Sequence, residues 1–161
     1  MVGGGSGALI GKVHRQAAMM TGAIDLVAGA FSSDNDASRQ FGIELGLDTK
    51  RAYGDFGEML DAEAALPEDE RIQCVSIVTP NGSHADIACM AMERGMHVIC
   101  DKPLAGNLED ALRIEAAVSK SGLLFRLTHT YIGYPLVVEA RERVRAGELG
   151  ALRRVSVSYL Q

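Results

Sequence analysis

The N-terminal stretch MVGGGSGALIGKVH, residues 1–14, decides the fold of this sequence. An apolar stub runs into a glycine cluster and then into an amphipathic segment, which is the order strand, tight turn, helix. Gly3, Gly5 and Ala8 fit the G-x-G-x-x-G/A spacing of a dinucleotide-binding turn, in which glycines permit the turn and the close approach of a pyrophosphate. The third small residue, Ala8 or Gly7, is expected to let the helix lie close to the strand. The helix N-terminus then offers N–H donors and partial positive charge to the phosphates.

Composition limits the class of protein. The 161 residues are 47% hydrophobic and 23% charged, which suits one domain that buries roughly two thirds of its unfolded surface. The net charge of −5 predicts no nucleic-acid partner, and the lack of a long apolar run or basic leader predicts no membrane anchor and a cytoplasmic location. Cys74, Cys89 and Cys100 lack C-x-x-C spacing and no two histidines share a helix face, so we expect reduced thiols and no metal site.

Glycine clusters also form plain flexible turns, so the first motif needs support from the rest of the chain. Hydrophobic periodicity and turn residues predict alternating helices and strands. The predicted helices cover 10–20, 37–45, 56–65, a segment ending near 94, 108–119 and 136–146, and the predicted strands cover 24–31, 51–53, 74–78, 97–100, 123–127 and 152–159. Strands that alternate with helices of this length imply right-handed parallel crossovers. The predicted fold class is therefore α/β, a doubly wound parallel sheet with helices on both faces.

The alternation of predicted strands and helices is interrupted after Leu127, where the polar and aromatic segment THTYIGYP leads into the last predicted helix. We therefore predict a first domain over residues 1–128, followed over 129–161 by a hinge and the start of a second α+β domain. Met1 and Val2 alone precede the glycines, although a central strand is normally about five residues long. We expect the sequence to be shortened at both ends.

Three loops follow predicted parallel strands at their carboxyl ends, the edge at which open α/β sheets bind ligands. They are Gly3–Gly11, Thr79–His84 and Asp101–Pro103. With these loops the chain resembles the N-terminal NAD(P)-binding Rossmann domain of the Gfo/Idh/MocA oxidoreductases, the family of glucose-fructose oxidoreductase and inositol 2-dehydrogenase. The resemblance covers nearly the whole chain and rests on GGGSGALIG with His14, TPNGSH at 79–84, CDKP at 100–103 and GELG at 147–150.

The resemblance assigns the second loop to the nicotinamide end of the cofactor. It implies that Thr79, Pro80 and Asn81 pass beside the nicotinamide ribose and that His84 lies on the helix that follows. A helix cap explains Asn81 equally well, and a cap and a ligand contact are compatible.

Asp101 and Lys102 match the family's Glu-Lys-Pro motif, with a shorter carboxylate that is still expected beside the cofactor. The resemblance implies that Lys102 is catalytic and lies by the nicotinamide and the substrate hydroxyl. A fixed ammonium there stabilises a developing alkoxide while hydride leaves the carbon, and it helps to move the hydroxyl proton. The alternative, a solvated surface lysine, leaves the Asp-Lys-Pro context unexplained.

The choice of cofactor depends on the end of the second strand. An acidic residue there holds the ribose 2′-hydroxyl of NAD, whereas Ser or Arg accommodates the 2′-phosphate of NADP. Ser32 and Arg39 align with the positions at which NADP-using members place phosphate contacts, and Asp34 comes one step late. The sequence therefore favours NADP over NAD. In the alternative interpretation, Ser32 and Ser33 cap the next helix and Arg39 is a solvated helical charge.

His129 and Tyr131 are the candidate substrate contacts, because they fall where the family chain passes into its substrate domain. The family's Asn-x-Arg-Phe-like signature is replaced here by THTYIGYP, so the arginine often found near the nicotinamide is missing. Packing of a domain hinge explains Tyr131 and Tyr134 equally well. His14 and His97 are interpreted as structural, with His14 on the adenine or pyrophosphate side.

The leading hypothesis is an NAD(P)-dependent dehydrogenase or reductase that acts on a sugar, a cyclitol or a related polyol or ketone. By the resemblance, the parent protein is a homo-oligomer whose second domain carries the acid-base histidine and most of the dimer contact. One alternative is a non-catalytic module that senses dinucleotides or mediates interactions. Another is a methyltransferase that uses S-adenosylmethionine, which expects an acidic residue where Phe31 and Ser32 stand and leaves Asp101–Pro103 unexplained.

Overall fold

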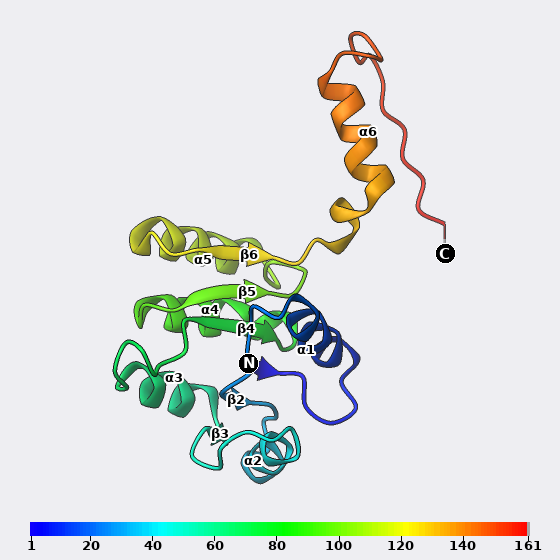
Figure 1. Cartoon of the computed structure of the whole chain (residues 1–161). Coiled ribbons are helices and arrows are strands. Elements are labelled where there is room, and N and C mark those ends of the chain that lie inside the picture. Colours follow the sequence, from blue (N-terminus) through cyan, green and yellow to red (C-terminus); the bar gives the residue numbers. More distant parts are fainter. Residues whose placement is uncertain (161) are drawn as a thin grey trace. The chain divides into compact units, whose positions relative to one another are not determined.

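Figure 1 shows the computed structural model of the chain, which describes residues 1–160. Contacts between residues divide the chain into a first unit, Met1–Thr128, and a second unit that begins at His129. Every strand assigned within residues 1–160 belongs to the first unit.

The first unit is built on one six-stranded sheet. Its strands are β1 (Val2–Gly3), β2 (Gly29–Ala30), β3 (Ala52–Tyr53), β4 (Cys74–Val78), β5 (His97–Cys100) and β6 (Phe125–Leu127). Their spatial order is β3-β2-β1-β4-β5-β6 and every neighbouring pair is parallel. This order confirms the predicted doubly wound α/β fold, and it brings the carboxyl ends of β1, β4 and β5 next to one another.

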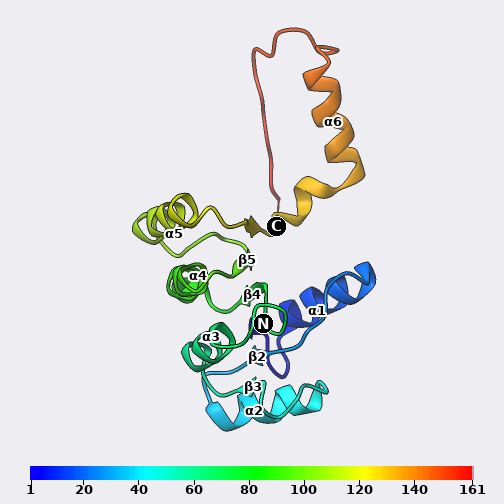
Figure 2. The same cartoon turned by 60° about the vertical axis from the view of Figure 1, so that its left-hand side comes forward.

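Helices cover both faces of this sheet. They are α1 (Leu9–Thr21), α2 (Asn35–Glu44), α3 (Phe56–Ala64), α4 (His84–Glu93) and α5 (Leu108–Ser121), and a 3-10 turn η1 (Asn81–Ser83) precedes α4. Figures 1 and 2 show α1 and α2 on one face and α3, α4 and α5 on the other. Right-handed crossovers on the two sides of β1 produce this division.

Short polar side chains fix the starts of three helices. The caps are Asp34 of α2, Asp55 of α3 and Asn107 of α5, each of which accepts a hydrogen bond from a backbone N–H of the first turn. Helix α1 differs, because Ala8 stands at its N-cap and offers no side-chain acceptor. The first N–H groups of α1 therefore lack the side-chain partner that the other three helices have.

The hydrophobic core is concentrated on the face covered by α3, α4 and α5. Its fully buried side chains include Met59 and Leu60 of α3, Ile87 of α4, Ile114 of α5 and Val75 of β4. Burial of each such side chain contributes about 1.5–3 kcal/mol to folding. This layer holds the sheet in place beneath the loops at its carboxyl edge.

The predicted strand over residues 24–31 is wrong in its extent, because β2 contains only Gly29 and Ala30. Val2, the first residue of β1, pairs with Ala30, the last residue of β2. A parallel strand extends only as far as a neighbour supplies hydrogen bonds, so the apolar residues of 24–27 have no ladder partner in β1.

The second unit contains a 3-10 turn η2 (Thr130–Gly133) and helix α6 (Pro135–Arg145). Pro135 stands in the first turn of α6, where its missing N–H leaves no bond unmade. The predicted strand over residues 152–159 is wrong, because the structure assigns no strand there and its side chains are exposed. Alternating residues form a strand only when another strand pairs with them, and no strand of residues 1–160 does so.

Candidate functional site

The glycine turn after β1 has backbone geometry that larger residues cannot adopt. Gly3 has φ +79°, and a Cβ built on it lies 2.7 Å from Thr79 Cγ2. A Cβ built on Gly5 lies 2.7 Å from the carbonyl oxygen of Phe31, the residue after β2. Both positions therefore require glycine, and the turn lies against the ends of β2 and β4.

The expectation that Ala8 or Gly7 lets the helix approach the strand is wrong. Ala8 is exposed at the N-cap of α1, and a Cβ on Gly7 meets nothing within 4 Å. Gly11 performs this packing role instead, since its Cβ would lie 2.4 Å from Gly4 Cα. The sequence signal for Gly11 was available, because it closes the glycine cluster GGGSGALIG on the first turns of the helix.

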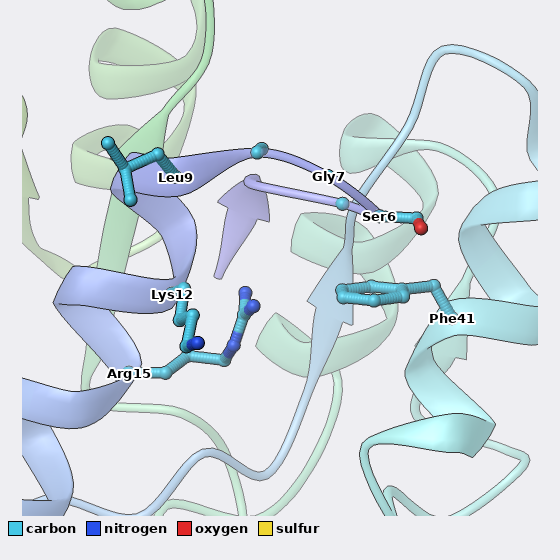
Figure 3. Close-up of a pocket in the computed structure, with 8 residues that line it drawn as sticks. Ser6, Gly7, Leu9, Lys12, Arg15 and Phe41 are labelled. Atoms are coloured by element: carbon cyan, nitrogen blue, oxygen red, sulfur yellow. The ribbon is translucent and has the colours of Figure 1, made fainter.

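A pocket of about 330 Å³ opens between the glycine turn, α1 and α2 (Figure 3). Lys12 and Arg15 of α1 face Phe41 of α2 across it, with Ser6 and Gly7 of the turn at its rim. Arg15 donates a hydrogen bond to the Gly4 carbonyl at 2.8 Å, and its guanidinium lies 5.3 Å from the centre of the Phe41 ring. Burial lowers the pKa of Arg15 from its usual value.

These features fit the phosphates of a dinucleotide. Gly5 and Gly7 of the turn line the pocket without side chains, the start of α1 has no side-chain cap and no acidic residue in its first turn, and two cations line the pocket. The sequence analysis missed Lys12 and Arg15, although their spacing of three residues places them on one helix face.

The two predicted 2′-phosphate contacts have different surroundings. Ser32 is exposed after β2, and its hydroxyl oxygen accepts a hydrogen bond from the N–H of Asp34 at 3.1 Å. Asp34 in turn caps α2, so its carboxylate is engaged with the backbone. The Arg39 guanidinium is paired with Glu58 at 2.8 Å and is half-exposed. Both contacts remain predictions.

The second loop is held in place by its own polar groups and by His84. The Ser83 hydroxyl donates to Thr79 Oγ1 and to the Pro80 carbonyl, both at 2.8 Å. Asn81 is exposed and its side chain caps no helix within the described chain, which leaves it open to a ligand.

His84 is buried, and its ring nitrogens lie 2.9 Å from the Pro103 carbonyl oxygen and 3.0 Å from the Thr79 carbonyl oxygen. This histidine thus joins the second and third loops from beneath. Together with the contact of Gly3 against Thr79, it brings all three predicted loops to one stretch of the carboxyl edge.

The third loop carries a held carboxylate beside an exposed ammonium. Asp101 Oδ1 accepts the Thr128 hydroxyl at 2.7 Å and lies 3.6 Å from His14 Nε2. Lys102 is exposed, and no hydrogen-bond or ion-pair partner is found for it within residues 1–160. The expectation that His14 lies on the adenine or pyrophosphate side is wrong, because its ring contacts β4 and Asp101.

The predicted substrate residues belong to the second unit. His129 precedes η2, and Tyr131 lies in it with an exposed ring in edge contact with Tyr134, at 5.5 Å between ring centres. Their role remains a prediction.

Two further properties concern only the described part of the chain. Residues 1–160 contain no group of three or more His, Cys, Asp or Glu side chains arranged to hold a metal ion. None of their helices is both long and apolar enough to span a membrane.

The doubly wound sheet, its glycine turn and the uncapped helix start define a dinucleotide-binding Rossmann domain. Residues 1–129 match the Gfo/Idh/MocA family, described as an oxidoreductase family with an NAD-binding Rossmann fold, and the chain belongs to this family. The family resemblance inferred from the sequence is thereby confirmed, and the chain is an NAD-binding oxidoreductase domain.

Relatives match nearly the whole chain but only part of their own length. The chain is 36% identical over 160 residues to the uncharacterised oxidoreductase YfiI of Bacillus subtilis, covering 99% of this chain and 40% of the relative. It is 33% identical over 132 residues to D-xylose 1-dehydrogenase (NADP(+)) 2 of Haloferax volcanii, covering 82% and 38%. A crystal structure of an inositol dehydrogenase homologue from Azotobacter vinelandii, complexed with NADH and myo-inositol, matches with TM-score 0.87 and 41% identity over 93% of this chain and 39% of that chain. The chain therefore spans about two fifths of the length of these relatives.

Proposed function

We propose that this chain is the cofactor-binding part of a dehydrogenase or reductase that moves hydride between NADP(H) and a sugar, a cyclitol or a related polyol or ketone. The observation that carries the proposal is the meeting of three loops at one edge of the sheet, through Gly3, Thr79, His84 and Pro103. Lys102 is the exposed cation next to that meeting point.

A bound nicotinamide dinucleotide supplies the hydride acceptor or donor. Its pyrophosphate is placed at the turn formed by Gly3, Gly5 and Ala8, where no side-chain cap competes for the first N–H groups of α1. The nicotinamide ribose then lies along the second loop, where the exposed amide of Asn81 can both donate and accept a hydrogen bond.

Lys102 is the proposed catalytic residue. Its ammonium presents three N–H donors, so it can hold the substrate oxygen and stabilise the alkoxide that develops as hydride leaves the carbon. In the reduction direction the ammonium gives one proton to the carbonyl oxygen as hydride reaches the carbon, and in the oxidation direction the neutral amine takes that proton back. Proton transfer of this kind contributes typically 10²–10⁴-fold to rate. The exposure of Lys102 at the sheet edge leaves it accessible to a substrate.

The substrate class follows from the relatives, which include a D-xylose dehydrogenase and an inositol dehydrogenase homologue holding myo-inositol. Both compounds carry several hydroxyl groups, and His129 and Tyr131 are side chains that exchange hydrogen bonds with hydroxyls. We place these two residues among the substrate contacts of the whole protein, which we propose is a cytoplasmic homo-oligomer.

NADP is the proposed cofactor because none of the three residues directly after β2 is acidic. Ser32 takes the position of the NAD-specific acid, and Asp34 is engaged as the cap of α2. Arg39 contacts the 2′-phosphate by exchanging its exposed ion pair with Glu58, which is a small loss because such surface pairs contribute about 0–1 kcal/mol.

Fluorescence titration of the purified chain with NADPH and NADH tests the proposal. NADPH is expected to bind more tightly than NADH, and Arg39→Ala is expected to raise the Kd for NADPH about tenfold while leaving the Kd for NADH within about twofold. Lys120→Ala, an exposed lysine on α5, is the matched control and is expected to change neither value.

Equal affinities that Arg39→Ala leaves unchanged contradict the phosphorylated cofactor, and the absence of binding at millimolar concentration contradicts the function itself. Assays of myo-inositol and D-xylose oxidation, with wild type and Lys102→Met, separate an enzyme from the alternative of a non-catalytic sensing or interaction module. An enzyme loses about 100-fold in kcat on this substitution, a larger effect than the rise of about five- to tenfold expected in the dinucleotide Kd. Tight binding without oxidation of any polyol, even in a full-length version of the protein, favours the module.

A further inference from the structure

A chain of polar side chains runs beneath the third loop. The imidazole of His14 lies between β4 and the end of β5, with Nδ1 3.0 Å from Ser76 Oγ and Nε2 3.6 Å from Asp101 Oδ1. The side chains of His14 and Asp101 are only 12% and 17% exposed. Since Ser76 lies on β4, His14 on α1 and Asp101 after β5, three separate elements meet here.

Two groups flank the Asp101 carboxylate. The Thr128 hydroxyl donates to Oδ1 at 2.7 Å, and His14 Nε2 lies within ion-pair range of the same oxygen at 3.6 Å. On the other side of the ring, His14 Nδ1 shares a hydrogen bond with the Ser76 hydroxyl, which holds the ring between β4 and Asp101. Asp101 is thus held by Thr128 and flanked by the His14 ring.

The order Ser, His, Asp does not make a nucleophilic site here. Ser76 lies inside β4, opposite Ile99 of β5 and two positions before the strand ends at Val78. Ligands of parallel sheets bind beyond the strand ends, and the Ser76 hydroxyl stands short of that edge beside α1. A role in positioning fits this location.

The held carboxylate determines where the next side chain points. The N–H of Asp101 donates to the Ile77 carbonyl at 2.9 Å, which continues the β4–β5 ladder one residue beyond β5. Thr128 is tied to the same place, because its N–H donates to the Cys100 carbonyl at 2.9 Å. Lys102 follows in a bend, and its side chain is exposed while that of Asp101 is only 17% exposed, so the two neighbouring side chains lie on different sides of the loop.

We propose that His14 and Thr128 are positioning residues, which hold the Asp101 carboxylate inward and thereby direct the Lys102 ammonium toward the nicotinamide end of a bound dinucleotide. This inference rests on the proposed function, because it assigns a purpose to the direction of Lys102. It also assigns different roles to two neighbouring residues of the Asp-Lys-Pro motif: Asp101 holds the loop in place, and Lys102 faces the ligand.

The contribution of the nicotinamide end to binding is measured by comparing the Kd values of two ligands. Each dinucleotide is paired with its counterpart that lacks nicotinamide, namely ADP-ribose for NADH and 2′-phospho-ADP-ribose for NADPH. His14→Ala and Thr128→Val are expected to raise the Kd of the dinucleotide about five- to tenfold, the size of one ordinary hydrogen bond, and to leave its counterpart within about twofold. Thr128→Ser keeps the hydroxyl and is expected to restore wild-type affinity.

His97 provides the matched control. It is another half-buried histidine on the same sheet, but it starts β5 and its Nδ1 accepts the N–H of Leu124 at 3.1 Å, away from the carboxyl edge. His97→Ala is expected to lower the midpoint temperature of unfolding. It is expected to change the Kd of the dinucleotide and the Kd of its counterpart by the same factor. An equal loss for both ligands in His14→Ala or Thr128→Val, or no loss in either variant, overturns the positioning role.

A readout without ligand keeps this inference distinguishable from the proposed function. Lysines labelled by reductive ¹³C-methylation give a resonance for Lys102, assigned by its absence in Lys102→Met. This resonance is expected to shift in His14→Ala and Thr128→Val and to stay in place in Thr128→Ser and His97→Ala. If wild type binds neither dinucleotide, the proposed function fails, while that pattern of shifts still supports the link from His14 and Thr128 to Lys102. An unmoved resonance in His14→Ala and Thr128→Val contradicts the link.

Discussion

The two faces of the sheet are built by different means. On the face of α3, α4 and α5, large apolar side chains such as Leu60, Ile87 and Ile114 are fully buried. On the other face, the buried residues of α1 and α2 are only Gly11, Ser38 and Gly42. Ser38 acts through its hydroxyl, which bridges the N–H of the residue after β2 and a carbonyl of β3 at 2.7 and 2.6 Å.

This difference assigns separate tasks to the two faces. Apolar burial on one face supplies most of the stability, because each large side chain removed from water contributes free energy in proportion to its area. Close backbone approach and polar contacts on the other face shape the turn, the pocket and the support of Asp101. Changes on the first face are therefore expected to affect folding, and changes on the second to affect binding.

The largest effect is expected on the free energy of unfolding, when one isoleucine from each face is replaced. Ile114 of α5 is 2% exposed, whereas Ile10 of α1 is 39% exposed. Ile114→Ala leaves a cavity and is expected to lower the free energy of unfolding by about 2–5 kcal/mol, measured by urea denaturation. Ile10→Ala is expected to cost about 1 kcal/mol or less, since Ile10 is partly in water, leaves no enclosed cavity and is replaced by a residue that favours the helix. Similar losses of unfolding free energy in the two variants contradict the assignment of stability to the face of α3, α4 and α5.

A methyl group on the other face is expected to act mainly on the ligand. In Gly11→Ala the new Cβ lies 2.4 Å from Gly4 Cα and 2.6 Å from Gly4 O, so α1 must move away from the turn. We expect a loss of about 1–3 kcal/mol in stability and a rise of about tenfold or more in the dinucleotide Kd. Ala17→Ser, on the exposed side of the same helix, is the control and is expected to leave both near wild type. Unchanged affinity in Gly11→Ala contradicts the role given to this close approach.

The smallest effect is expected on the reactivity of a buried thiol, which tests the packing of the core face without a substitution. Cys100 is fully buried in the core at the end of β5, and burial, with a smaller contribution from the charge of Asp101, raises its pKa to about 12. Only the thiolate reacts with iodoacetamide, so a raised pKa keeps Cys100 unreactive at pH 8, and its rate is expected to rise about tenfold per pH unit below 12. Mass spectrometry should find Cys100 alkylated last, after the exposed Cys74 and the half-buried Cys89. Early loss of the Cys100 thiol at pH 8 shows that the core opens at this end.

The order of elements was largely predictable from the sequence. Strands β4 and β5 fall at the predicted residues, because each is a short apolar run bounded by turn residues and buried on both sides. Helix ends were predictable where a cap or a glycine stands, as at Asp34 and Gly122.

Features that depend on a distant partner were not predictable. The length of β2 is limited by its neighbour β1, and residues 152–159 alternate like a strand without another strand to pair with. The contacts of His14 and Arg39 were not predictable for the same reason, because their partners are distant in the sequence. Ser76, the partner of His14, lies 62 positions away, and Arg39 pairs with Glu58. Sequence spacing placed the candidate residues on the right loops, and tertiary contacts decide which of them face inward.

The most direct test of the account follows the backbone amides of the ¹⁵N-labelled chain during titration with NADPH and with NADH. The account predicts that amides of Gly3–Gly11, Thr79–His84 and Asp101–Lys102 shift together with a single Kd, while amides of Met59 and Ile114 on the core face stay in place. Shifts confined to one of these loops, shifts centred on the α3–α5 face, or no shifts at millimolar dinucleotide contradict the claim that the three loops form one binding site.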